Sequence, residues 1–253
     1  MYYVEMLAAR NRLLWFSSIV VLIGLVAIVT VRQAHAVNVD VEGSVGVPFG
    51  VMLLGASWFT CIMSTLLGAT LARDYLHLPY IWTRPIARGR IAFEYILVDC
   101  VTILIAFGIL VGVAAAVLSV VPRLYLESGQ QTLWPALLRA ISVPLMWYGL
   151  IEVASSWRGK RAQSFAGLSW AVFWALIILD ALNFPGPAGA VIVALNLFNP
   201  MAYLPQQHSS NFTVGVTGAP AFPLSFNEQT LLAYFIFFAS CIVAIYAWKR
   251  MEV

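Results

Sequence analysis

Long apolar runs are the feature of this sequence that most constrains its fold. A helix that crosses the hydrocarbon of a membrane needs roughly 20 predominantly apolar residues, and six runs in this chain approach or exceed that length. They cover residues 13–31, 47–72, 91–121, 133–157, 164–184 and 230–248. The third run is longer than a bilayer requires, so its helix should tilt or extend into water. The runs predict an all-α integral membrane protein with six transmembrane helices.

The composition predicts the same class. Hydrophobic residues make up 62% of the 253 residues and charged residues only 10%, whereas a soluble domain is about a quarter charged. So few charges do not suffice to cover the apolar surface of this chain in water. No polar block is long enough to fold by itself. We therefore expect residues 1–253 to form a single transmembrane domain in contact with membrane lipid.

The positions of Lys and Arg predict the orientation, because these residues are enriched in cytoplasmic loops. If the N-terminus is inside, eleven of the fourteen are cytoplasmic: Arg10, Arg12, Arg73, Arg84, Arg88, Arg90, Arg158, Lys160, Arg161, Lys249 and Arg250. Arg32 and Arg123 would then lie outside. We expect both termini in the cytoplasm. Because the basic residues flank spans and form no patch, we do not expect nucleic acid as a partner.

Two further segments are apolar but too short or too charged to span. Residues 1–12 carry Glu5, Arg10 and Arg12 beside apolar side chains, which predicts a short helix on the cytoplasmic membrane surface. Residues 188–197 form a run of about ten residues bounded by prolines, a length typical of a re-entrant segment. We expect it to form an outer hairpin between the fifth and sixth spans.

The segment that joins the second and third spans is basic and also rich in large apolar side chains. Leu76, Leu78, Tyr80, Ile81 and Trp82 lie among its arginines. A loop that only needs solvation does not require so many apolar groups, so this segment should press against a neighbour. That neighbour is either a layer of anionic lipid headgroups, which the arginines would attract, or another protein.

Arg84-Pro85-Ile86-Ala87-Arg88 resembles a signature of the permease subunits of ATP-binding-cassette exporters, in the type-two permease family. That family carries a Pro-small-small-Arg pattern just before its third helix. Leu76-His77-Leu78 departs from the acidic-Gly-Thr stretch that usually precedes it. Asn199-Pro200 is similar to an element after the family's outer hairpin. The resemblance implies a short cytoplasmic coupling helix that contacts an ATPase through Arg73, Tyr80, Trp82, Arg84, Pro85, Arg88 and Arg90.

The same resemblance implies the partners and the site of action. The partners would be a separate nucleotide-binding ATPase subunit and a second permease chain, identical or related. ATP and Mg would bind in the ATPase, and this chain would hold no cofactor. The location would be the plasma membrane, in bacteria the inner membrane. The resemblance places the path between the first, second and fifth spans. Asp99 is a candidate to line it, and so are Trp170 and Trp174, which lie one helical turn apart and would otherwise contact lipid.

Charged residues inside the spans are costly and are usually paired or functional. Glu94 and Glu152 lie near cytoplasmic ends and are expected to reach toward nearby arginines. Asp99 lies nine residues past Arg90, about 13 Å deep at the helical rise, and needs a polar partner or a water-filled cavity. Arg139 and Asp180 lie at similar depths below the outer surface. We expect these two to pair, with contact between Arg139 and an anionic substrate as the alternative.

Other classes of protein are less well matched. The three histidines are far apart in sequence and show no metal-binding spacing, and Cys61, Cys100 and Cys241 all lie inside apolar runs without a CxxC pair. No P-loop is present. The sequence therefore predicts neither catalytic residues nor a metal site. The alternatives are a non-transporting anchor or assembly subunit of a larger complex, and an intramembrane enzyme.

Overall fold

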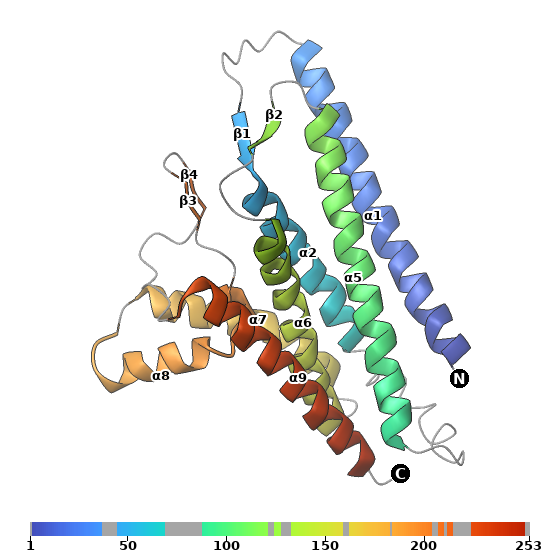
Figure 1. Cartoon of the computed structure of the whole chain (residues 1–253), viewed down its shortest axis with the longest axis vertical. Coiled ribbons are helices and arrows are strands. Elements are labelled where there is room, and N and C mark those ends of the chain that lie inside the picture. The colour runs from blue at the N-terminus through green and yellow to red at the C-terminus, as the bar shows by residue number, and fades with distance from the viewer. Residues whose placement is uncertain are drawn as a thin grey trace.

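A computed structural model describes the backbone of residues 2–36, 45–68, 88–120, 124–127, 133–158, 162–182, 184–203, 207–209, 212–214 and 224–250. This part of the chain contains seven α-helices and one short 3-10 helix (Figure 1). The helices are α1 (Tyr2–Ala36), α2 (Phe49–Gly68), α5 (Arg88–Val120), α6 (Leu133–Arg158), α7 (Ala162–Ala181), α8 (Pro187–Asn196) and α9 (Phe226–Arg250). The 3-10 helix is η3 (Pro200–Tyr203).

Four short strands lie in the connections, and the sequence did not predict them. Strand β1 (Val45–Pro48) pairs in parallel with β2 (Leu124–Glu127), with Val45 opposite Leu124. Strands β3 (Gln207–Ser209) and β4 (Phe212–Val214) form an antiparallel pair. The β1–β2 pair joins the segment before α2 to the segment after α5, at the end of the bundle away from the two termini (Figure 1).

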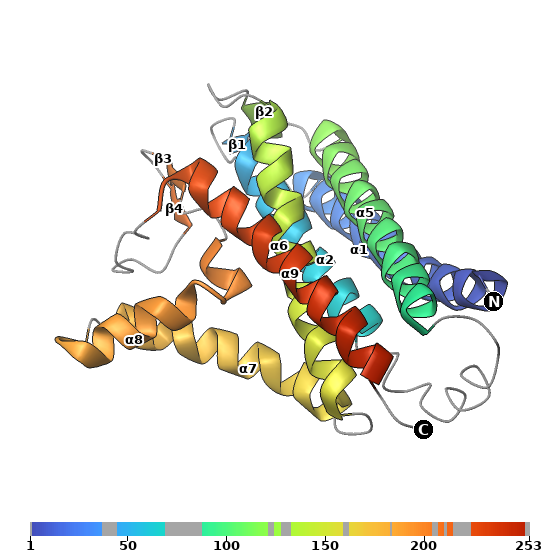
Figure 2. The same cartoon turned by 60° about the horizontal axis from the view of Figure 1, so that its bottom comes forward.

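The helices run up and down, with α6 at the centre of the packing. Helix α6 packs against α2 on one side and α9 on another, and α1 packs along α5. Both chain ends and the start of α5 lie at the same end of the bundle (Figure 1). Helices α7 and α8 form a hairpin that extends sideways from the bundle (Figure 2). Gly186 makes its turn with a φ of 73°, a conformation that glycine adopts without steric cost.

Four of the described helices contain segments long and apolar enough to cross a membrane. These are Ala9–Thr30, Gly89–Val120, Trp134–Ser156 and Asn227–Arg250. Helices α2 and α7 have 20 residues each, about 30 Å at the helical rise, but their apolar parts within the described side chains are shorter. The structure thus agrees with the predicted class of helical membrane protein, and the count of six spans stays a prediction.

Several predicted boundaries change. The separate surface helix expected over residues 1–12 is wrong, because α1 continues as one helix from Tyr2 to Ala36. The second predicted span began at residue 47, but residues 47 and 48 belong to β1. The predicted sixth span is extended to Phe226–Arg250. Ser225 and Glu228 form a capping box at its start, with the Ser225 amide 2.7 Å from Glu228 Oε2.

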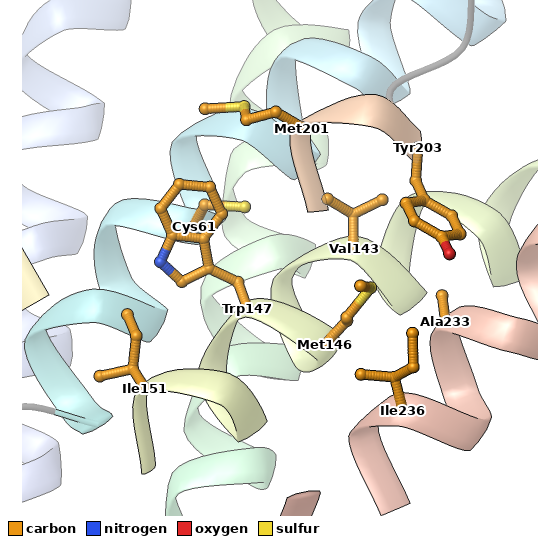
Figure 3. Packing of buried hydrophobic residues seen from close by; sticks show 9 residues of the cluster. All are labelled: Cys61, Val143, Met146, Trp147, Ile151, Met201, Tyr203, Ala233 and Ile236. Carbon is orange, nitrogen blue, oxygen red and sulfur yellow. The ribbon is translucent and has the colours of Figure 1, made fainter. Parts of the chain in front are cut away.

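The apolar core follows α6. One cluster joins α2, α6, η3 and α9 (Figure 3) and consists of Cys61, Val143, Met146, Trp147, Ile151, Met201, Tyr203, Ala233 and Ile236. Two close approaches bring the helices together. A side chain at Gly68 would meet Ile151 Cγ2 at 2.8 Å, and one at Gly149 would meet Ser240 Cβ at 3.1 Å. These glycines therefore set how closely α2 and α9 lie against α6.

Candidate functional site

Two carboxyl groups are buried inside the bundle where α5, α6 and α9 meet. The Tyr148 hydroxyl donates to Asp99 Oδ2 at 3.0 Å, so the predicted polar partner of Asp99 is confirmed. One helical turn further along α6, Glu152 Oε1 accepts a hydrogen bond from the Trp248 indole at 3.1 Å. Glu152 is fully buried, and its Oε2 has no hydrogen-bond partner among the described residues.

Glu94 and Glu152 therefore behave differently, although the sequence predicted the same behaviour for both. Glu94 Oε1 pairs with Arg90 Nε at 3.0 Å, and the Arg90 side chain is 74% exposed. The expectation that Glu152 would reach toward an arginine in the same way is wrong, because α9 lies close against α6 at Gly149 and Trp248 covers the carboxyl group. Glu152 thus belongs to the core of the bundle.

A second buried polar group surrounds Arg139 on α6. Arg139 Nη2 donates to Gln229 Oε1 at 2.8 Å and to the Tyr203 carbonyl oxygen at 3.2 Å. Gln229 in turn donates to the Leu224 carbonyl. One guanidinium thus ties η3 and the start of α9 to α6. The predicted pair with Asp180 stays a prediction, since the Asp180 side chain lies outside the described residues.

The Asn199-Pro200 element is held by a chain of side-chain hydrogen bonds. Asn199 Nδ2 donates to the Phe173 carbonyl on α7 at 3.0 Å and to Asn196 Oδ1 at 2.9 Å. Its Oδ1 accepts from the Met201 amide at 3.1 Å. The Tyr203 hydroxyl donates to the Leu197 carbonyl at 2.7 Å, and burial raises the pKa of Tyr203. The turn after α8 is therefore fixed to both α7 and α6.

Trp170 lies in an aromatic contact between helices. Its indole nitrogen donates to the Thr65 hydroxyl at 3.0 Å, and the Trp147 indole donates to the same oxygen at 2.9 Å. Thr65 itself donates to the Cys61 carbonyl. Trp174 is 42% exposed on α7. Of the predicted path residues, Asp99 is thus buried, Trp170 is partly buried between helices and Trp174 is at the surface. Their role in a path stays a prediction.

Most of the predicted coupling segment lies outside the described residues, including Arg73, Tyr80, Trp82, Arg84 and Pro85. The two ends of that segment are described. Gly68 ends α2, and its carbonyl oxygen accepts from Ser155 Oγ at 2.6 Å. At the other end, Arg88 begins α5. A side chain at Gly89 would meet the Lys249 side chain at 3.3 Å, so the start of α5 lies beside the end of α9.

No metal site is evident in the part of the chain that the structure describes. There, no three His, Cys, Asp or Glu side chains are arranged to hold a metal ion. The three cysteines are free thiols, two of them buried. Chemically, the site offers two carboxyl groups in apolar surroundings. Asp99 accepts a hydrogen bond from Tyr148, and Glu152 has one oxygen with a donor and one without.

Sequence reasoning missed Thr65, Gln229 and the burial of Glu152. A signal existed for Glu152, because Tyr148 and Glu152 lie four residues apart and so share one face of a helix. For Thr65 and Gln229 the sequence holds no comparable signal. Their partners are 82 and 90 residues away along the chain.

The long apolar helices and their buried polar contacts define a helical membrane protein. Comparison of the chain with known protein families, with curated proteins and with solved structures gave no match. Its function therefore has to be inferred from its own residues and their geometry.

Proposed function

We propose that this chain is the membrane-embedded subunit of an ATP-driven exporter that takes its energy from a separate ATPase subunit. The observation that carries the proposal is the way the basic segment 69–87 is attached. Its sequence resembles a coupling helix, and both of its ends join helices that are packed into the bundle. A force on this segment would therefore reach the core directly.

The attachment at Gly68 supports that transmission. The Ser155 hydroxyl holds the last turn of α2, and the missing side chain of Gly68 lets Ile151 approach. Because α2 and α6 are in such close contact, a displacement of the end of α2 is expected to carry α6 with it. Packed interiors transmit strain since they contain few voids.

At Arg88 the segment joins α5, which connects it to a second pair of helices, α5 and α9. Ile91, Ala92 and Tyr95 at the start of α5 pack with Ala244 and Trp248 of α9. A push on residues 69–87 would thus act on two helix pairs, α2 with α6 and α5 with α9. The mechanism we propose is that ATP-driven closure of the ATPase rocks these pairs between inward-facing and outward-facing arrangements.

The predicted membrane topology fits this mechanism. The start of α5, which carries Arg90, and the end of α9, which carries Lys249 and Arg250, lie at the end of the bundle where α1 begins (Figure 1). Positive residues favour the cytoplasmic side, which is where an ATPase would bind. Helix α8 and the Asn199-Pro200 turn cover the residues expected to form the outer hairpin between the fifth and sixth spans. We propose a second permease chain, identical or related, to complete the path.

The proposal is tested by purifying the tagged full-length chain from its native membranes and assaying bound ATPase activity. We expect an ATP-hydrolysing subunit to co-purify, and Arg84→Glu and Arg88→Glu to remove it. Arg250→Glu is the matched control, because Arg250 is an exposed base at the same end of the bundle that stacks on Tyr246 at 4.4 Å. It should leave the complex intact.

Two outcomes would overturn the proposal. If no nucleotide-hydrolysing subunit accompanies the intact chain, the energy source we propose is missing. If the complex survives both Arg84→Glu and Arg88→Glu, the segment does not bind the ATPase, and an anchor or assembly subunit becomes the better description.

A further inference from the structure

We propose that Glu152 is a proton-binding site and that its carboxyl group is the neutral acid when α5, α6 and α9 are packed as in this structure. The inference does not depend on the proposed transport function. It concerns a simple step in which Glu152 Oε2 takes up one proton from water, forming an O–H bond, and returns it when the site opens.

The first support is the burial of the carboxyl group without a full set of donors. Glu152 has no exposed surface. An ionised carboxylate has about four sites that accept hydrogen bonds, yet the Trp248 indole on Oε1 is the single donor found among the described residues. An ionised carboxylate in such a place would exchange its hydration for a single hydrogen bond, and such groups normally become neutral instead.

The second support is the set of neighbours. The titratable groups that face Glu152 among the described residues are Asp99 and Cys100 on α5, Tyr148 on α6 and Cys241 on α9. Every one of them is neutral or negative at neutral pH, so none offsets a negative charge. Asp99 already accepts the Tyr148 hydroxyl. Two carboxyl groups that share an apolar site do not readily ionise together.

The third support is that the geometry distinguishes the two oxygens. Oε1 accepts from Trp248 and therefore suits the carbonyl oxygen, while the unpartnered Oε2 suits the hydroxyl. A bound metal cation does not fit as well, because Ca²⁺ takes six to eight oxygen ligands and Mg²⁺ demands an octahedral shell. No group of three ligating side chains is present in the described part of the chain. A proton is the ligand that needs a single oxygen.

The site would couple protonation to helix packing. Trp248 belongs to α9 and Glu152 to α6, so any separation of these helices admits water and releases the proton. The packed arrangement would accordingly be favoured at low pH and weakened at high pH.

The test is infrared spectroscopy of the purified full-length protein in lipid vesicles at neutral pH. A protonated carboxyl group has a carbonyl stretching band that a carboxylate lacks. We expect this band in the wild type, its loss in Glu152→Gln, and its retention in Glu94→Gln. Glu94 is the matched control because it is paired with Arg90. Loss of the band in Glu94→Gln, or its absence from the wild type, would overturn the proposal.

Two further variants test whether the infrared band belongs to Glu152. Trp248→Phe keeps Glu152 but removes the donor to Oε1, so the band should move to higher frequency, and an unmoved band would contradict the geometry. Asp99→Asn should keep the band and lower the pH at which it disappears, since a neighbouring negative charge is gone. A band that is lost in Asp99→Asn and kept in Glu152→Gln would assign the proton to Asp99 and overturn the proposal.

Discussion

The rings of Trp147 on α6 and Trp170 on α7 lie with their centroids 4.4 Å apart, and both indole nitrogens point at one oxygen atom, the hydroxyl of Thr65 on α2. A hydroxyl accepts two hydrogen bonds and donates one, and Thr65 donates to the Cys61 carbonyl. Its bonding capacity is thus complete. Three helices meet at this atom, and through it the α7–α8 hairpin is joined to the bundle.

Replacement of Thr65 by Val should loosen that junction. The change keeps the shape but leaves two indole N–H groups without an acceptor, at a cost of about 1–3 kcal/mol for each unsatisfied group. We expect a lower melting temperature of the protein in detergent and faster hydrogen exchange in α7. Thr60→Val is the control, since Thr60 is also buried on α2 and its hydroxyl donates to the Ala56 carbonyl of its own helix. Equal changes in melting temperature and in hydrogen exchange for Thr65→Val and Thr60→Val would contradict the proposed role of Thr65 in joining α7 to the bundle.

Arg139 should be needed for the position of η3. Arg139→Met keeps much of the side-chain length but removes the donors to the Tyr203 carbonyl and to Gln229. We expect a loss of about 1–3 kcal/mol for an acceptor left unsatisfied, together with faster exchange of the backbone amides of η3. Arg90→Met is the control, because an exposed ion pair contributes about 0–1 kcal/mol. Unchanged exchange in η3 would show that Arg139 does not hold it.

The predicted pair of Arg139 with Asp180 is tested by a double-mutant cycle. If the two side chains interact, Arg139→Gln and Asp180→Asn should be non-additive by about 0.5–3 kcal/mol in the free energy of unfolding. Additive effects would mean that the contacts with Tyr203 and Gln229 account for the burial of Arg139 without Asp180.

Two glycine substitutions should have opposite effects. In Gly68→Ala the new methyl group would meet Ile151 Cγ2 at 2.8 Å, and overpacking of this kind costs about 1–3 kcal/mol. In Gly108→Ala the methyl group would meet nothing within 4 Å, so the higher helix propensity of alanine, about 1 kcal/mol, should leave stability unchanged or raised. Thermal unfolding of both variants checks this. An unchanged melting temperature of Gly68→Ala would contradict the close approach of α2 and α6.

The orientation in the membrane can be measured on a single helix. Asn227 and Arg250 are exposed residues near opposite ends of α9. In whole cells, a thiol reagent that does not cross membranes should label Asn227→Cys directly and Arg250→Cys only after the membrane is opened. The native cysteines should contribute little background, because Cys61 and Cys241 are buried and Cys100 is half-buried. The reverse labelling pattern would show that the predicted orientation in the membrane is wrong.

The helices were predictable from the sequence because apolar runs have a length that the membrane dictates. The start of the third predicted span differs by three residues from that of α5, and the fourth span differs by one residue from α6 at its end. The predicted break after residue 12 fails because nothing there disfavours a helix. Charged residues such as Arg10 and Arg12 do not end a helix, and neither glycine nor proline follows them.

The buried polar contacts were less predictable, since they depend on which helices become neighbours. The depth of Asp99 predicted a polar partner or a water-filled cavity, but only the packing of α5 on α6 identifies Tyr148 as the partner. Likewise the sequence placed Glu152 near a helix end, where reaching toward water is the usual outcome, and the approach of α9 at Gly149 reversed it. Hydropathy alone does not encode which faces meet.

Helix α1 makes most of its contacts along α5, and side chains such as Trp15 and Leu22 are 74% and 61% exposed. Its main neighbour, α5, is synthesised after α1, because α5 begins only at Arg88. If the helices enter the membrane in chain order, α1 is in contact with lipid before α5 is in place. The exposed apolar side chains of α1, among them Ile19 and Val26, suit contact with lipid. Packing of α5 along α1 would then be a late step in the assembly of the bundle.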